Sequence, residues 1–414
     1  MQAKTKRKII NDPVYGFITI RHAFILELID HPWFQRLRRI AQLGLSHLVY
    51  PGALHNRFQH AIGAMHLMQN AIDELRLKGK QISEDEELGL LAAVLLHDIG
   101  HGPFSHALEY SIAREIHHES ISSIMMEKLN EQYDGKLDIA IQIFNNNYPK
   151  KFLHQLVSSQ LDMDRLDYLA RDSFFSGVVE GQVGSERILK MLDAIDDQLV
   201  VEEKGIYSIE KFIVARRFMY WQVYLHKTVL SAEFMLVNAL RRARQLAGQG
   251  QELFCSPALR FFLYNNITRK ELLTDSLPLE LYAQLDDFDI TGALKVWQFH
   301  EDKVLAELAY RLVNRNLFKI EIQKQPFTDS VKEEHLGNIM QAMSLSREDA
   351  SYFLINERVD NRAYNSLNDE IKILMKDGSV MDAGEVSDHL NIAGLSQLVE
   401  KFFIAYPAAE KIRN

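Results

Sequence analysis

An adjacent histidine and aspartate, His97 and Asp98, close an apolar run over residues 90–96. A buried helix that ends in an imidazole and a carboxylate brings two groups to one point, and both bind hard or borderline metal ions. Residues 99–106 then contain two glycines and a proline, which end the helix, and two more histidines. Eight of the 16 histidines lie within residues 55–118, and burying such a cluster without partners would be costly. The pattern therefore predicts a metal-dependent active site.

Two other segments offer the remaining ligand types. His60 stands at the start of an expected helix, and the segment 161–172 is a second expected helix that is dense in carboxylates. On that helix Asp164 and Asp167 share a face, and Asp167 is spaced to pair with Arg171. One histidine, the His-Asp pair and one aspartate from three helices could form a four-ligand N/O site that leaves positions for water or substrate. Such a site suits one divalent ion of manganese, iron, zinc or magnesium better than copper or an iron–sulfur cluster.

Composition is typical of a cytoplasmic enzyme. The chain of 414 residues suggests two or three domains, and 47% of its residues are hydrophobic. A net charge of −9 argues against broad binding to nucleic acid, which needs a basic surface. Cys255 is the only cysteine, so the sequence predicts no disulfide framework and no thiolate zinc site. The basic start of the chain has no long apolar stretch behind it, and no run reaches membrane-spanning length, so we expect no membrane partner.

Helical periodicity dominates residues 1–248, and the pattern changes after Gly248-Gln249-Gly250. We expect helices over these segments: 32–43, 58–72, 87–97, 161–172 with Asp162 as its N-cap, and 209–247. We expect β structure at these segments: 16–20, a hairpin of 199–201 with 206–208 that turns near Lys204-Gly205, 317–322, 352–355, and 371–375 followed by a turn at 376–379. The fold class is therefore mainly α, with a catalytic core and N-terminal regulatory segment over 1–248 and a small α+β subdomain over 249–414.

The order of His60, His97-Asp98 and Asp164 resembles the H…HD…D signature of the HD-domain phosphohydrolases. Within that superfamily the chain is most similar to the deoxynucleoside triphosphate triphosphohydrolases, which include bacterial dGTPase-like enzymes and a vertebrate enzyme with a sterile-alpha-motif and an HD domain. The similar stretches span most of residues 8–230: 10–13, 34–38, 42–44, 50–60, 97–106, 118–119 and 162–172. The resemblance implies an HD-domain helical core.

The resemblance also implies a ligand set and catalytic roles. It selects His60, His97, Asp98 and Asp164 as metal ligands over the neighbouring His55, His66 and Asp167. A metal there would polarise a phosphoryl oxygen and lower the pKa of a bound water. His101 and His118 match contacts to the α-phosphate. His106 matches the proton donor to the departing sugar oxygen, paired with Glu109, where the family has an aspartate.

The same resemblance assigns the substrate contacts. Arginine suits phosphate because its guanidinium fork matches phosphate oxygens. The residues that match triphosphate contacts are Arg57, Arg165 and Arg216. Those that match sugar contacts are Gln42 and Asp172 at the 3′-hydroxyl, Tyr168 at the phosphate or sugar, and Tyr224 on the sugar face. Tyr224 has a second interpretation as a core aromatic, and Leu225 replaces a glutamine of the vertebrate enzyme, so base preference does not transfer.

Four residues near the N-terminus match positions around the activator-nucleotide site of the vertebrate enzyme: Asn11, Asp30, Gln35 and Arg38. The other interpretation is structural, with Asp30 capping the helix that starts at Pro32 and Arg38 as a surface charge. Relatives of this type assemble around such sites, so we expect a homo-oligomer.

The resemblance predicts a metal-dependent dNTP triphosphohydrolase with a dNTP as its partner. The alternatives are another HD phosphohydrolase, which would cleave a phosphodiester or guanosine tetraphosphate, and a nucleotide-sensing scaffold with weak catalysis.

Overall fold

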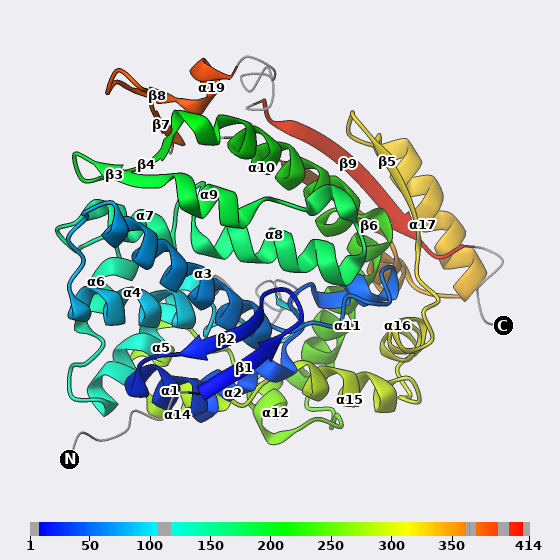
Figure 1. Ribbon diagram of the computed structural model, residues 1–414. Helices are drawn as coiled ribbons and strands as arrows, with labels where there is room; N and C mark the ends of the chain where they lie inside the picture. The colour runs from blue at the N-terminus through cyan, green and yellow to red at the C-terminus, as the bar shows by residue number, and fades with distance from the viewer. Residues whose placement is uncertain (1–7, 106–116, 362–363, 365–369, 388–396, 409–414) are drawn as a thin grey trace.

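The computed structural model describes residues 8–105, 117–361, 364, 370–387 and 397–408, and the fold is mainly α-helical (Figure 1). This confirms the predicted fold class. Within the described residues, no helix is both long enough and apolar enough to cross a membrane.

Two capped helices form the centre of the core. Helix α3 (Arg57–Leu77) starts at Asn56 and helix α4 (Glu84–Leu96) starts at Ser83, each with a capping box in which side chain and backbone bond reciprocally. Every residue of the apolar run 90–96 is buried, so α4 is surrounded by other elements. Helix α3 packs against both α4 and α8 (Met163–Ser176), which places the ends of three helices around one point.

The remaining helices surround this centre. In Figure 1, α8 runs across the middle of the molecule with α9 and α10 above it, and α10 contacts both of these helices. The helices that precede residue 249 are α1 (Ala23–Asp30), α2 (Pro32–Gln35), α5 (His118–Gln132), α6 (Asp138–Phe144), α7 (Lys151–Val157), α9 (Ser185–Met191), α10 (Ile206–Met219) and α11 (Lys227–Gly248). Those that follow are α12 (Pro257–Tyr264), α13 (Arg269–Thr274), α14 (Ser276–Tyr282), α15 (Asp287–Trp297), α16 (Lys303–Val313), α17 (Asp329–Met343), α18 (Arg347–Ala350) and α19 (Ala383–Val386).

The strands of the described residues form three small sheets. The β signal at 16–20 is confirmed as β2 (Gly16–Ile20), which pairs with β1 (Lys8–Asp12) in an N-terminal hairpin that the sequence did not predict. A second sheet has the order β3 (Leu192–Ile195), β4 (Gln198–Glu202), β7 (Lys372–Leu374), β8 (Val380–Asp382). The third has the order β5 (Lys319–Gln323), β9 (Val399–Tyr406), β6 (Ile355–Asn361), and β9 crosses the upper right of Figure 1.

The expected hairpin of 199–201 with 206–208 is wrong. Strand β4 pairs antiparallel with the preceding β3, with Asp193 opposite Val200. A single 3-10 turn follows at Glu203–Gly205, and Ile206 then begins α10. The apolar residues after Gly205 therefore belong to a buried helix face, which a short segment of sequence cannot distinguish from a strand.

Two expected helices are also interrupted. The long helix of 209–247 consists of α10, a π-helical turn at Tyr220–Tyr224, and α11, which begins after His226. The helix of 32–43 ends early, because a 3-10 turn at Arg36–Arg39 leads into Ala41, which bridges to Asn56. In both places tertiary contacts prevail over local periodicity.

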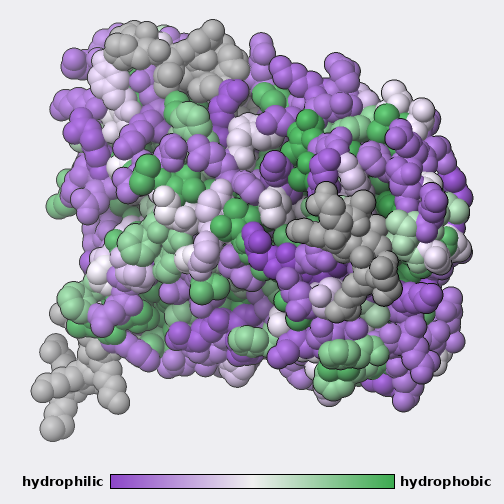
Figure 2. Space-filling view, turned by 90° about the vertical axis from the view of Figure 1, so that its right-hand side faces the viewer, coloured by the Kyte–Doolittle hydropathy of each residue, from purple (hydrophilic) through white to green (hydrophobic). Residues whose placement is uncertain are grey.

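Elements that follow residue 248 pack directly against elements that precede it. Strand β7 pairs in parallel with β4, and α11 packs against α16. Arg36 is fully buried and donates to the carbonyls of Leu285 (2.9 Å) and Ile99 (2.7 Å). The segment after residue 249 is therefore attached directly to the element that follows His97 and Asp98. In Figure 2, hydrophilic residues spread over the face shown, with smaller hydrophobic patches between them.

Candidate active site

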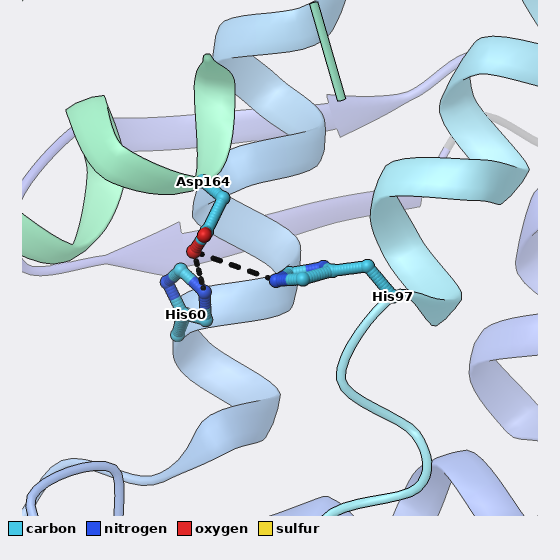
Figure 3. Close-up of side chains that lie close together, drawn as sticks. All are labelled: His60, His97 and Asp164. Carbon is cyan, nitrogen blue, oxygen red and sulfur yellow. Dashed lines mark ion pairs between the residues drawn. The ribbon is translucent and has the colours of Figure 1, made fainter. Parts of the chain in front are cut away.

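Three predicted ligand groups converge where α3, α4 and α8 meet. His60 comes from the first turn of α3, His97 caps the end of α4, and Asp164 lies in the first turn of α8 (Figure 3). The Asp164 Oδ1 atom lies 3.0 Å from His60 Nε2 and 3.4 Å from His97 Nε2. One ligand atom from each residue fits within a mutual distance of 4.8 Å, which is close enough for a shared metal ion.

Asp98, the fourth predicted ligand, borders this group. Its Oδ1 lies 3.4 Å from His97 Nε2 and its Oδ2 lies 3.8 Å from His60 Nε2. Its carboxylate also forms a second group with His101 and His118, again with ligand atoms within 4.8 Å of one another. The structure therefore brings all four predicted ligands together and places two predicted phosphate contacts beside them.

The donor atoms fit a divalent cation. The Nε2 atoms of His60 and His97 are buried and make no hydrogen bond within the described part of the chain. The other nitrogen of each ring makes a hydrogen bond. His60 Nδ1 bonds to Asp167 Oδ2 (2.7 Å), and His97 Nδ1 bonds to the carbonyl of Val94 (2.6 Å). Such bonds are typical of metal-binding histidines, because they fix the ring and leave Nε2 as the ligand atom.

Electrostatics also favour a cation at this point. Burial opposes a charge on His60, but the adjacent Asp164 and Asp167 carboxylates outweigh it and raise its pKa to about 10. Burial likewise opposes a charge on His97, and Asp98 and Asp164 raise its pKa to about 9. The carboxylates thus stabilise positive charge in a buried space, and a bound metal ion would supply that charge.

A buried ion network supports the His60 ring from behind. Asp167 accepts from Arg171 Nε (2.9 Å) and Nη2 (3.0 Å), which confirms the predicted pair. Arg171 also donates to Asp12 (2.7 Å), a contact that the sequence did not predict. Removing one member of such a network leaves another charge buried and unpaired.

Gly63 makes room for this network, and Gly63→Ala should disrupt it. A Cβ there would lie 2.0 Å from Asp167 Oδ1 and 2.1 Å from Arg171 Nη2, and both side chains are fully buried. We expect the free energy of unfolding to fall by about 1–3 kcal/mol, and metal affinity to fall ~10–100-fold through His60. Chemical denaturation and metal titration measure the two effects.

The matched control is Gly292→Ala in α15, where a Cβ meets no atom within 4 Å. Helix propensity alone should leave that variant as stable as the parent or more stable. Equal stability and metal affinity in both variants would contradict the role of Gly63.

Two of the three cationic predicted contacts, Arg57 and Arg165, lie beside the ligand group. Arg57 is buried and pairs with Asp98 through Nη1, and its Nη2 donates to Ser105 Oγ (2.7 Å). Arg165 Nε donates to the carbonyl of Ser159 (2.6 Å). Arg216 Nε is buried and makes no hydrogen bond within the described residues. None of these three arginines is therefore a fully solvated surface charge.

A polar cavity of about 410 Å³ adjoins the ligand group. Its walls include His97, Asp164 and Arg165, and also Arg269 from the first turn of α13. The sequence did not suggest Arg269, since it lies beyond residue 248 in a segment without a recognisable motif. His118 also borders this cavity, stacked on His101 with ring centroids 3.8 Å apart.

The predicted sugar contacts form a second cluster. Asp172 accepts from the Tyr224 hydroxyl (2.8 Å) and pairs with His55 Nε2 (2.7 Å). The carbonyl of His55 accepts from Gln42 N (3.0 Å), and Gln42 Oε1 is buried without a hydrogen bond in the described residues. The Tyr168 ring meets the Tyr224 ring edge-on, with centroids 6.1 Å apart. The residues that the resemblance assigned to the sugar of the substrate thus lie in one cluster, and His55 belongs to the same cluster.

Two predicted catalytic residues, His106 and Glu109, lie outside the described residues. Among the predicted regulatory residues, Gln35 Oε1 accepts a hydrogen bond from Arg38 Nε (2.8 Å). The Asp30 Oδ1 atom lies 3.9 Å from Lys8 Nζ. Asn11 belongs to β1, where it pairs in register with Phe17. The interpretation of Asp30 as the cap of the helix at Pro32 is wrong, because His31 is the N-cap of α2.

Comparison with known proteins agrees with this geometry. The HD domain family model matches residues 57–172, and the HD associated region model matches residues 183–254. A crystal structure of a phosphohydrolase from Bacteroides thetaiotaomicron has a TM-score of 0.95 and 52% identity, over 97% of this chain and 100% of that chain. The uncharacterized protein YwfO of Bacillus subtilis is 34% identical over 87% of this chain and 82% of its own length.

The human deoxynucleoside triphosphate triphosphohydrolase SAMHD1 is 30% identical over 77% of this chain. That alignment covers 55% of the human protein, so the chain spans about half of its length. Similarity along nearly the whole chain, together with the convergent ligand group, assigns the chain to the HD-domain phosphohydrolases.

Proposed function

We propose that this protein hydrolyses dNTPs to deoxynucleosides and inorganic triphosphate. The observation that carries the proposal is the placement of His60, His97 and Asp164 next to a polar cavity and within reach of arginine side chains. A triphosphate needs such cations, because charge on the departing and transferred groups must be offset in a low-dielectric site. The similarity to proteins named as deoxynucleoside triphosphate triphosphohydrolases supports the same substrate class.

In this proposal, His60, His97, Asp98 and Asp164 would hold one divalent ion, which would supply Lewis-acid polarisation of a phosphoryl oxygen and a bound water of lowered pKa. Water attacks the α-phosphorus and loses a proton to solvent, the bond from that phosphorus to the 5′-oxygen breaks, and His106, paired with Glu109, protonates the departing oxygen. His101 and His118 contact the α-phosphate, while Arg57, Arg165 and Arg216 bind the triphosphate.

The second cluster selects the sugar. Asp172 and Gln42 bind the 3′-hydroxyl, and Tyr224 covers the sugar face. Tyr224 is held by its hydrogen bond to Asp172 Oδ2, so turning aside for a 2′-hydroxyl would leave that oxygen of the buried carboxylate without its donor, while Oδ1 stays paired with His55. This supports the tyrosine as a substrate contact as well as a packed aromatic.

Product identification tests the proposal directly. Purified protein is incubated with each of the four dNTPs and with manganese, iron, zinc or magnesium, and products are separated by ion-exchange chromatography. We expect deoxynucleoside and triphosphate, and hydrolysis in oxygen-18 water should place the label in triphosphate. Release of orthophosphate or pyrophosphate would indicate another HD phosphohydrolase, and binding without turnover would indicate a nucleotide-sensing scaffold.

A further inference from the structure

The carboxylate of Asp287 joins two segments of the active site that are far apart in sequence. Asp287 is the first residue of α15 and is half-buried. Its Oδ2 accepts from the backbone N–H of Ala41 (2.8 Å), and its Oδ1 accepts from the backbone N–H of Phe104 (2.7 Å). A side chain from the C-terminal part of the chain thus bridges two loops of the catalytic core.

Both loops lead directly to predicted substrate contacts. Ala41 precedes Gln42, and its carbonyl accepts from Ser105 Oγ (3.2 Å). Ser105 follows Phe104, and its hydroxyl accepts from Arg57 Nε (3.2 Å) and Nη2 (2.7 Å). The guanidinium that faces Asp98 is therefore held by a hydroxyl whose own position depends on the bridged loops.

The loop at Phe104 needs an external restraint. Phe104 has φ of 51° and Ser105 has φ of 57°, in the left-handed region that residues other than glycine rarely adopt. Such a conformation persists when surrounding contacts over-determine it, and it is concentrated at functional sites. The bond from Phe104 N to Asp287 is one such contact, and it acts at the first of the two strained residues.

We propose that Asp287 is a positioning residue for the hydrolytic reaction, whose carboxylate holds the two loops so that Arg57 and Gln42 face the substrate. The inference rests on the proposed function for its substrate. It places a residue of the 249–414 segment in the active-site architecture without contact to the substrate itself.

Two acceptor atoms are essential to this role. An ionised carboxylate accepts with both oxygens, whereas a protonated carboxyl or an amide has a donor at one of the two positions. At that position an amide nitrogen cannot accept from the backbone N–H and a carboxyl O–H accepts only weakly, so the contact to one of the two loops would be lost or weakened.

The ionisation of Asp287 should therefore be visible in activity. Burial, which prevails over the bonds from Ala41 and Phe104, raises its pKa to about 6, with a smaller increase from the neighbouring Asp286. Asp287 also lines a mainly apolar cavity of about 530 Å³. The other charged or titratable groups that act on Asp287 or line this cavity are Arg36, Arg38, Arg39, His47, Arg57 and Lys295. Because the pKa is raised, the bridging ionised form dominates above about pH 6 and is lost as the pH falls through that value.

The test compares Asp287→Asn with Asp286→Asn, two equal changes at adjacent positions. Asp286 caps α15 and pairs with Arg39, and asparagine is an equally good N-cap, so this control should hydrolyse dATP like the parent. We expect Asp287→Asn to lose ~10²-fold in kcat/KM, as for small misplacements of substrate-positioning groups. Metal content and the circular dichroism spectrum should stay unchanged.

The pH dependence of the ratio of parent to Asp287→Asn activity provides a further readout, which a purely structural role of Asp287 would not change. This ratio should decrease as the pH falls from about one pH unit above the pKa of Asp287 to about one pH unit below it, because the protonated parent then also loses one acceptor. Titrations of the metal ligands affect both proteins and cancel in this ratio. If Asp287→Asn does not fold, Ser105→Ala tests the same link, because it removes the hydroxyl between the loop and Arg57.

Two outcomes would overturn the inference. One is dATP hydrolysis by Asp287→Asn, or by Ser105→Ala in its place, that equals that of Asp286→Asn. The other is a ratio of activities that does not change with pH. If the parent hydrolyses no dNTP, the proposed function fails, and hydrolysis of bis(4-nitrophenyl) phosphate by the same variants then decides the role of Asp287 separately.

Discussion

Replacing His97 and Asp98 together with alanine should remove both the metal and the hydrolytic activity. The double variant loses the ring whose Nε2 lies 3.4 Å from Asp164 and the carboxylate that borders both histidines. Two remaining protein ligands, His60 and Asp164, fall short of the three or four that hold catalytic divalent ions. Elemental analysis should find no bound metal, and dNTP turnover should fall to background.

The fold should survive this change. His97 lies at the end of α4, after the buried apolar run and its capping box, so the helix keeps its own stabilising contacts. Circular dichroism should therefore remain helical. His66→Ala on α3 is the matched control, because it removes a histidine that bonds to Asn70 and lies outside the ligand group. Full metal occupancy in the double variant would refute the ligand assignment.

Local sequence signals predicted the elements that carry these ligands. Asp162 caps α8 by accepting from Arg165 N (2.7 Å), and the spacing of Asp167 and Arg171 gives the observed ion pair. Both features depend on residues within one helical turn, so sequence spacing specifies them directly. The same holds for the end of α4, where apolar periodicity stops at His97.

Contacts between distant segments were not predictable in this way. The bridge from Asp287 to Ala41 and Phe104 spans 246 and 183 residues. An Asp-Asp pair at the start of a helix indicates an N-cap, and Asp286 fulfils that role, so no local pattern indicated that the Asp287 side chain bonds to distant loops. Arg269 illustrates the same limit, since only the packed chain places it at the cavity beside Asp164.

His106→Ala should lose most of its dNTP turnover and keep its metal. The 5′-oxygen of the sugar departs as an alkoxide unless a proton reaches it, and an alkoxide is a poor leaving group near neutral pH. Loss of a general acid typically lowers the rate ~10²–10⁴-fold, and this range is our expectation for kcat on dATP. Metal content and dNTP affinity should stay near the parent values, since His106 is assigned to neither.

His117→Ala is the matched control, because His117 is an exposed histidine that makes no side-chain cap at the start of α5. It should retain parental turnover. Equal turnover of dATP by His106→Ala and the parent would remove His106 from the mechanism.

A substrate with a better leaving group separates proton donation from a general loss of structure. The 4-nitrophenolate released from bis(4-nitrophenyl) phosphate is stable without a proton near neutral pH. If His106 is the proton donor, His106→Ala should lose far less activity on this diester than on dATP, because only the dNTP needs the acid. A variant whose active site has collapsed would lose both activities to the same extent. The difference between the two losses thus measures the contribution of the proton itself.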